Sequence, residues 1–172
     1  MASLDTHQAQ TSRPGTLPQE GCPIHGDKCP THHLMAFQKI SGKWQGTVTQ
    51  YSLDGQVLGS VKVDSENRLD CDSFYTLIVI TDPQGHQQRI EFTSTYSRKL
   101  DGFVVDNPAL KGTARQVGDA VVYTYDLKVP VPSFTFESVR VEGNTRLHSQ
   151  LNSSGGAFTG YSIIRETRVG NP

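Results

Sequence analysis

The fold is decided at residues 37–46, which read Phe37-x-x-Ile40-Ser41-Gly42-Lys43-Trp44-x-Gly46. This stretch joins a short apolar pattern, a glycine and the only tryptophan of the chain. Leu34, Phe37 and Ile40 recur at the three-residue spacing of one helix face, and a Ser-Gly pair is typical of a helix end. We therefore expect a helix over Thr31–Ser41 and a first strand that begins beside Trp44.

The chain after Gly42 is a series of strand patterns separated by turns. Asp54-Gly55 and Asp82–Gly85 are strong turn signals, and Asp64–Asp70 is expected to be a polar connection. The predicted strands are Lys43–Ser52, Gln56–Val63, Ser73–Thr81, Gln88–Arg98, Phe103–Asp106, Leu110–Val117, Ala120–Lys128, Phe134–Val141, Arg146–Asn152 and Ala157–Val169. Short strands with turns between them and no long crossover predict an all-β chain, a single antiparallel up-and-down β-barrel of about 8–10 strands.

Closure of this barrel requires the first strand to pair with the last. Trp44 would then plug one end as part of the core, with an arginine of the last strand stacked on its ring. Arg165 is our first choice for that arginine and Arg168 the second. They differ in strand parity, so only one of them can face the ring.

Composition sets the domain plan and excludes several classes of partner. Residues 1–30 are polar and are expected to form a flexible tail, which leaves residues 31–172 for the barrel. A net charge of −1 over 172 residues predicts no nucleic-acid and no membrane partner. The first residues lack a secretory apolar run, and three cysteines form no disulfide framework. A cytoplasmic location is therefore expected.

Two segments resemble known proteins: FQKISGKWQGTVTQYSLDGQVLGS at residues 37–60 and YSIIRETRV at residues 161–169. The Gly42-x-Trp44 pattern, with an arginine in the last strand, resembles the signature of lipocalins and other calycins. More closely, both segments resemble an uncharacterised cyanobacterial lipocalin-like family related to the S/U-type phycobilin lyases. The resemblance implies a cavity for one small, mostly apolar ligand, with a tetrapyrrole or another chromophore as the best candidate. It assigns no catalytic residue.

Polar side chains in the second half of the chain are the candidate ligand-binding residues. Alternation along the strands places each set either inside the barrel or outside it: Tyr123, Tyr125, Arg140, Arg146 and His148. If these sets point inward, the cavity holds donors suited to a ligand carboxylate. Antiparallel barrels usually bury their aliphatic face, which favours the other interpretation, in which the arginines and His148 lie on the exterior.

The N-terminal segment contains four side chains of the types that bind zinc: Cys22, His25, Cys29 and His32. Their spacing differs from that of a zinc finger, so we interpret them as incidental and any bound zinc as adventitious. Cys71 lies between two aspartates, which raise the pKa of a thiol and make it a poor site for covalent attachment.

Two functions of different class remain open on the sequence. The first is a binding module that holds a small hydrophobic ligand, as a monomer or a homodimer. The second is a lyase, isomerase or cyclase that uses the same cavity on a hydrophobic biosynthetic intermediate. The chain has no phosphate loop, G-x-S-x-G elbow or H-E-x-x-H motif. Catalysis by positioning alone leaves no such motif, so the residues do not decide whether the protein is an enzyme.

Overall fold

A computed structural model describes residues 29–128 and 133–170, which form one short helix and a closed ten-stranded barrel. The elements are α1 (Met35–Ile40), β1 (Gly42–Tyr51), β2 (Val57–Leu69), β3 (Ser73–Thr81), β4 (Gln87–Ser97), β5 (Gly102–Asp106), β6 (Leu110–Val117), β7 (Ala120–Leu127), β8 (Ser133–Glu142), β9 (Thr145–Ser154) and β10 (Ala157–Arg168). Each strand pairs antiparallel with its chain neighbours, and β1 pairs with β10. The predicted fold class and closure are confirmed.

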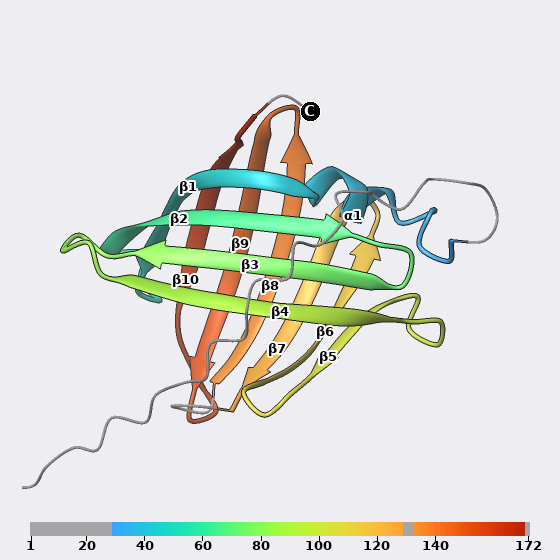
Figure 1. Ribbon diagram of the computed structural model, residues 1–172. Helices are drawn as coiled ribbons and strands as arrows, with labels where there is room; N and C mark the ends of the chain where they lie inside the picture. The colour runs from blue at the N-terminus through green and yellow to red at the C-terminus, as the bar shows by residue number, and fades with distance from the viewer. Residues whose placement is uncertain (1–28, 129–132, 171–172) are drawn as a thin grey trace, which may run out of the picture.

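The barrel is flattened into two layers. In Figure 1, β1–β4 lie in front and run across β6–β10 at a steep angle, with β5 at the edge. β3 and β4 pair over the whole of Ser73–Thr81, whereas β4 and β5 are joined by only three residue pairs, over Thr95–Ser97. The ring is therefore continuous but has one short seam, between β4 and β5.

Helix α1 closes one end of the barrel and carries much of the core. Phe37 is fully buried, and its ring lies 5.1 Å from that of Phe74 and 4.8 Å from that of Phe103. The helix is shorter than predicted because the residues before it form turns. Thr31 accepts a turn hydrogen bond from the Leu34 amide, and its hydroxyl donates to the carbonyl of Asp70. No helix in the described part of the chain is long and apolar enough to cross a membrane.

Both glycines of the deciding stretch are required by the barrel closure. Gly42 follows the helix at φ +118°, and a Cβ atom there would lie 2.5 Å from the guanidinium of Arg168. At Gly46 a Cβ atom would lie 1.9 Å from the carbonyl oxygen of Arg165 on the neighbouring strand. A side chain at Gly46 would therefore push β1 away from β10, whereas one at Gly42 would strain the backbone and displace the Arg168 guanidinium.

The prediction of a polar connection at Asp64–Asp70 is wrong, because β2 continues to Leu69. Ser65 and Asn67 of this stretch are buried inside the barrel, while Glu66 and Arg68 alternate toward the outside. The segment is polar on both faces. Its inner face meets other polar groups within the barrel, which a local reading of the sequence does not reveal.

Candidate functional site: a cavity with one apolar and one polar wall

The barrel encloses a cavity of about 450 Å³ between α1 and the opposite end. Strands β1–β4 supply a mostly apolar wall of Val48, Val61, Val63, Ile78, Ile80, Ile90 and Phe92. Strands β7–β10 supply most of the polar groups, namely Tyr123, Tyr125, Thr135, Glu137, Arg146, His148, Gln150, Asn152, Ser162 and Glu166. The two walls therefore differ in chemistry and face each other across the cavity.

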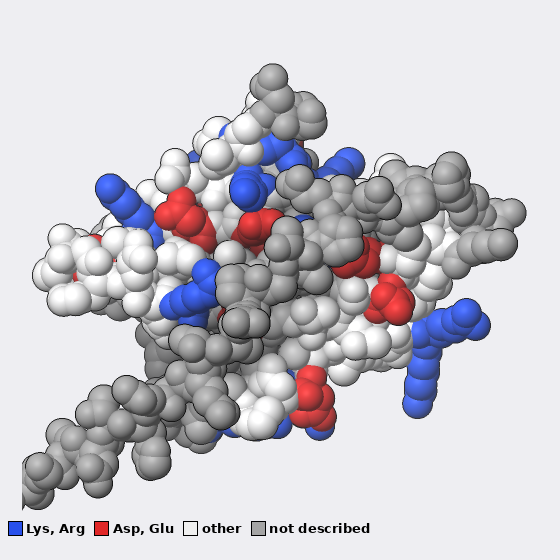
Figure 2. Space-filling view, in the orientation of Figure 1, with Lys and Arg blue, Asp and Glu red and all other residues white. Residues whose placement is uncertain are grey.

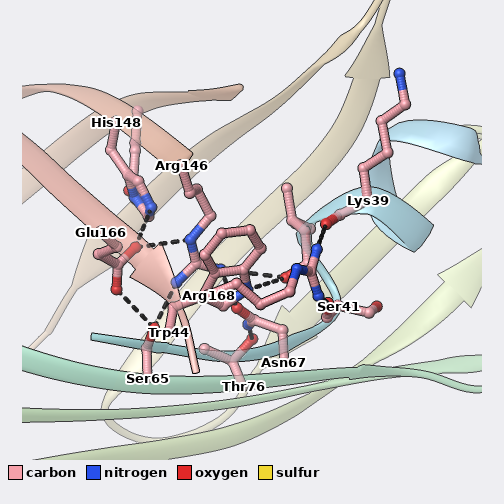
Figure 3. A network of polar contacts seen from close by, with 12 residues as sticks. Lys39, Ser41, Trp44, Ser65, Asn67, Thr76, Arg146, His148, Glu166 and Arg168 are labelled. Carbon is pink, nitrogen blue, oxygen red and sulfur yellow. Dashed lines mark hydrogen bonds and ion pairs between the residues drawn. The ribbon is translucent and has the colours of Figure 1, made fainter. Parts of the chain in front are cut away.

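Arg146 is the centre of a buried network at the closed end (Figure 3). Its Nε donates to Glu166 Oε2 at 2.6 Å, and its Nη1 donates to Asn67 Oδ1 at 2.6 Å and to the Ile40 carbonyl at 3.2 Å. Its Nη2 donates to the hydroxyl of Ser65. Four of the five N–H groups of a guanidinium are thus occupied by the protein itself. Arg146 lines the cavity, but it has little left to offer a ligand carboxylate.

Trp44 is the plug expected from the sequence, and it contacts two arginines. The side chain is 1% exposed, and its Nε1 donates to the Ile40 carbonyl at 2.8 Å. The guanidinium carbons of Arg168 and Arg146 lie 4.2 Å and 4.7 Å from the centre of its ring. Arg165 does not face the ring: it is exposed, because residues of that parity on β10 point outward. The first choice of Arg165 is therefore wrong, and Arg168 takes the role.

Arg168 also ties the last strand to the helix. Its Nη1 and Nη2 donate to the carbonyls of Ser41 and Lys39, both at 2.7 Å. These carbonyls lie at the C-terminal end of α1, where backbone acceptors are unpaired and cations are favourable. One side chain thus holds the helix, the tryptophan and the barrel closure together (Figure 3).

His148 links the closed end to the open cavity through two carboxylates. Its Nδ1 bonds Glu137 Oε1, and its Nε2 lies 2.8 Å from Glu166 Oε2, an ion pair that lacks hydrogen-bond alignment. Burial lowers the pKa of His148, but Glu137 and Glu166 outweigh this and raise it above 6.5. Burial raises the pKa of Glu166, yet His148 and Arg146 bring it down to about 2. The network therefore holds charged groups inside the barrel.

Tyr123 and Tyr125 are stacked on the inner face of β7, with ring centres 5.5 Å apart. Burial raises the pKa of both hydroxyls, so both are neutral donors at physiological pH. Neither hydroxyl has a hydrogen-bond partner among the residues the structure describes. Tyr123 lies directly opposite Glu137 on β8, which places a donor and an acceptor side by side on the polar wall.

The structure divides the predicted ligand-binding set by strand. Tyr123, Tyr125, Arg146 and His148 line the cavity, whereas Arg140 lies outside, 3.7 Å from Asp119. The favoured interpretation, with all arginines and His148 on the exterior, is wrong for β9. On that strand Leu147 and Leu151 are the exposed large apolar residues, at 40% and 43%. The reason is that the inner partners Glu166, Ser65 and Asn67 satisfy Arg146, so its burial is compensated.

Sequence reasoning missed Glu137 and Glu166, the two acids of the network. Their positions could have been found from parity, because Glu137 alternates with the buried Val139 and Glu166 with Ile164. For Arg168, the second choice from the sequence, the deciding information is the register of β1 against β10. Residues directly opposite each other in a ladder share a face, and Trp44 pairs with Arg168.

The proposed metal ligands are brought together only in part. Cys22 and His25 lie outside the described residues. Cys29 lies 3.4 Å from the Thr31 hydroxyl, and His32 Nδ1 lies 2.9 Å from the Cys29 carbonyl oxygen. Within residues 29–128 and 133–170, no group of three or more His, Cys, Asp or Glu side chains could hold a metal ion. Cys71 is disulfide-bonded and offers no free thiol, so the expectation of a chain without disulfides is wrong.

No family model and no curated protein matches the chain. Among solved structures, the S-type phycobiliprotein lyase CPES from Guillardia theta aligns with a TM-score of 0.59 and 11% identity, over 81% of this chain and 93% of that one. A protein of unknown function from the DUF3598 family of Nostoc punctiforme aligns with a TM-score of 0.62 and 16% identity, over 77% of this chain and 49% of that one. Rv2717c from M. tuberculosis aligns with a TM-score of 0.58 and 13% identity, over 80% and 97%.

These identities are low, so the comparisons concern the fold and leave the activity open. They agree with the resemblance seen at the first and last strands, and with the closed antiparallel barrel built around the Trp44 plug. The chain is a lipocalin-like β-barrel that shares its fold with an S-type phycobiliprotein lyase.

Proposed function

We propose that the protein binds one small, mostly apolar ligand in the barrel, with one polar edge of that ligand against β7–β10. The observation that carries this proposal is the pairing of an apolar wall with a polar wall around about 450 Å³. Cavities of roughly 300–1,000 Å³ with mostly apolar linings and a few placed polar groups are typical of small-molecule sites.

The free polar groups define what the ligand edge must carry. The hydroxyls of Tyr123 and Tyr125 can donate, and the second oxygen of Glu137 can accept, because His148 occupies only Oε1. Arg146 and Arg168 are occupied by protein acceptors. The proposed ligand therefore has a carbonyl or similar acceptor beside an N–H or O–H donor. A linear tetrapyrrole, with lactam and pyrrole groups along one edge, has this chemistry.

The test is whether the protein binds biliverdin and the uncharged probe N-phenyl-1-naphthylamine at one molecule per chain. Fluorescence and native mass spectrometry measure this binding. Ile78→Trp places an indole in the cavity and should abolish binding of both. Its neighbour Val79 belongs to the opposite face of β3, so Val79→Trp is the matched control and should bind normally. Equal binding by both variants, or no binding by the parent chain, would contradict the proposal.

Catalysis in the same cavity is the second candidate, and Tyr123 and His148, two cavity side chains whose pKa values are raised, favour it. Ionisable groups with shifted pKa values in a cavity are a feature of acid–base catalysts. His148→Asn would separate the two functions. An enzyme should lose turnover of a bound candidate substrate while it retains binding, whereas a carrier should show no turnover in either form.

A further inference from the structure

The outer face of β8, β9, β10, β1 and β2 is ordered in rows that run across the strands. One row, toward the open end of the barrel, consists of Phe136, Leu151, Tyr161 and Tyr51, each directly opposite the next. Phe136 and Leu151 are 38% and 43% exposed, and the rings of Tyr51 and Tyr161 stack 4.9 Å apart. An apolar row on the outside of a barrel is unusual and marks an interaction surface.

This apolar row continues to the rim of the open end. Phe134 precedes Phe136 by two residues on β8 and so lies nearer the rim. Phe158 lies near the start of β10 and is 59% exposed. Leu53, Val57 and Leu58 around the β1–β2 hairpin are each more than 60% exposed. The apolar side chains thus lie at turns and strand ends, where they project from the barrel and do not form a flat patch.

A second row on the same face, farther from the rim, is basic. It consists of Arg140, Leu147, Arg165, Thr47 and Lys62, again each directly opposite the next. All three cations are exposed. The acids Asp64 and Glu142 come one row farther still. Figure 2 shows the β1–β4 side, where basic and acidic side chains are interspersed over the visible surface.

We propose that this end of the barrel docks on an anionic phospholipid surface. The basic row lies four residues from the aromatic row, about 13 Å along a strand, and strand tilt reduces this to roughly 10 Å. Apolar groups of surface-bound proteins sink about 5–10 Å into the headgroup region. The cations therefore reach the level of the lipid phosphates when the aromatic row is immersed. This ordering of apolar and then basic rows complements an anionic membrane.

Several carboxylates lie at this end of the barrel and keep the contact superficial; Asp82 follows β3 and Asp106 ends β5. Asp54 lies at the tip of the β1–β2 hairpin, where Gln56 donates to it at 2.9 Å, and Asp126 lies opposite Phe134. A net charge of −1 for the whole chain does not describe this face. The basic row itself contains no acid, and within the described part of the chain only Arg140 of its three cations is paired with an acid, Asp119 at 3.7 Å. The proposal is independent of ligand binding in the cavity.

Vesicle sedimentation with the full chain tests the proposal. We expect binding to phosphatidylcholine–phosphatidylserine vesicles at low salt, weak binding to pure phosphatidylcholine, and loss of binding at high salt. Each of Arg140→Gln and Arg165→Gln should weaken binding about fivefold. Arg98 is an exposed arginine in the β4–β5 turn, and Arg98→Gln should leave binding unchanged.

A second pair of variants, one test and one control, measures the contribution of the apolar side chains at the rim. Phe158→Ser should weaken binding severalfold, whereas Val117→Ser, at 60% exposure beside the β6–β7 turn, should not. Circular dichroism confirms that each variant folds. Absence of binding to anionic vesicles, or equal binding to neutral ones, overturns the proposal. So does a dimer in analytical ultracentrifugation that Phe158→Ser dissociates, because a second copy would then cover this face.

Discussion

The guanidinium of Arg168 lies 4.2 Å from the centre of the Trp44 ring, and the two residues are direct partners in the β1–β10 ladder. The same guanidinium donates to two carbonyls at the end of α1. The contact therefore joins three parts of the chain that are far apart in sequence: the helix, the first strand and the last strand.

Replacing Arg168 with lysine should destabilise the protein by about 1–3 kcal/mol, because an ammonium cannot stack as a plane and bond two carbonyls at once. Arg165→Lys is the matched control, since Arg165 is exposed on the same strand, and it should change stability by less than about 0.5 kcal/mol. Urea unfolding measures both. Equal effects would show that the closure does not depend on Arg168.

Trp44→Ala should cost on the order of 3–5 kcal/mol, because it empties the space of a large buried aromatic side chain. Trp44 is the only tryptophan, so the fluorescence of the native protein reports this site alone. Its emission should be blue-shifted and resistant to quenching by iodide until the protein unfolds. Ready quenching in the native state would mean that the end of the barrel is open.

Glu166→Gln should destabilise the protein by about 3–5 kcal/mol, because it leaves the charge of Arg146 buried without its counterion. The Arg146 and Glu166 side chains are 2% and 1% exposed, so water cannot replace the lost partner. Glu142→Gln, at an exposed position on β8, supplies the control and should be nearly neutral. A neutral Glu166→Gln variant would argue against a charged network.

Stability should fall in acid because of Glu166. Its pKa is about 2 in the folded protein and 4.5 when free, so its contribution is complete above pH 4.5 and is lost as the pH falls toward 2. The loss is on the order of 3 kcal/mol. His148 acts with the opposite sign, since its raised pKa stabilises the fold below pH 6.5 and less as the pH rises through the folded value.

Thermal unfolding across this pH range measures both changes in stability, the loss in acid due to Glu166 and the loss at higher pH due to His148. Glu166→Gln should remove most of the fall in stability between pH 4.5 and 2, because the group that titrates in that range is gone. A similar fall in stability between pH 4.5 and 2 in the parent and the variant would assign the acid sensitivity to other carboxylates.

Turn chemistry explains why the strands could be predicted from the sequence. Residues Asp54-Gly55 and Asp82–Gly85 set where the chain reverses, and Ser73–Thr81 is predicted with the bounds found in the structure. The sequence pattern predicts that this strand ends at Val63, because Ser65 and Asn67 are polar, whereas β2 continues to Leu69. Local pattern assigns such residues to loops, and their true partner, Arg146, lies about 80 residues away in the chain.

Which face of a strand points inward depends on those distant partners. On β8 the rule holds at the buried Val139 and the outward Arg140, but it fails at the cavity-lining Glu137 and at Phe134 and Phe136, which are exposed. On β9 the rule fails, since Arg146 and His148 are inside and Leu147 is exposed. The cost of burying a guanidinium is removed by Glu166 and by polar groups of β2, so hydropathy along β9 alone gives the wrong orientation.

Only three residue pairs join β4 to β5, so this seam is the part of the barrel wall with the fewest ladder hydrogen bonds. Phe92 of β4 and Tyr125 of β7, whose ring centres lie 6.0 Å apart, are the inner contact on that side. Separating β4 from β5 would break only a few ladder hydrogen bonds. Separating β3 from β4 would break a ladder three times as long. We therefore expect the barrel, if it opens to admit a longer molecule, to open between β4 and β5.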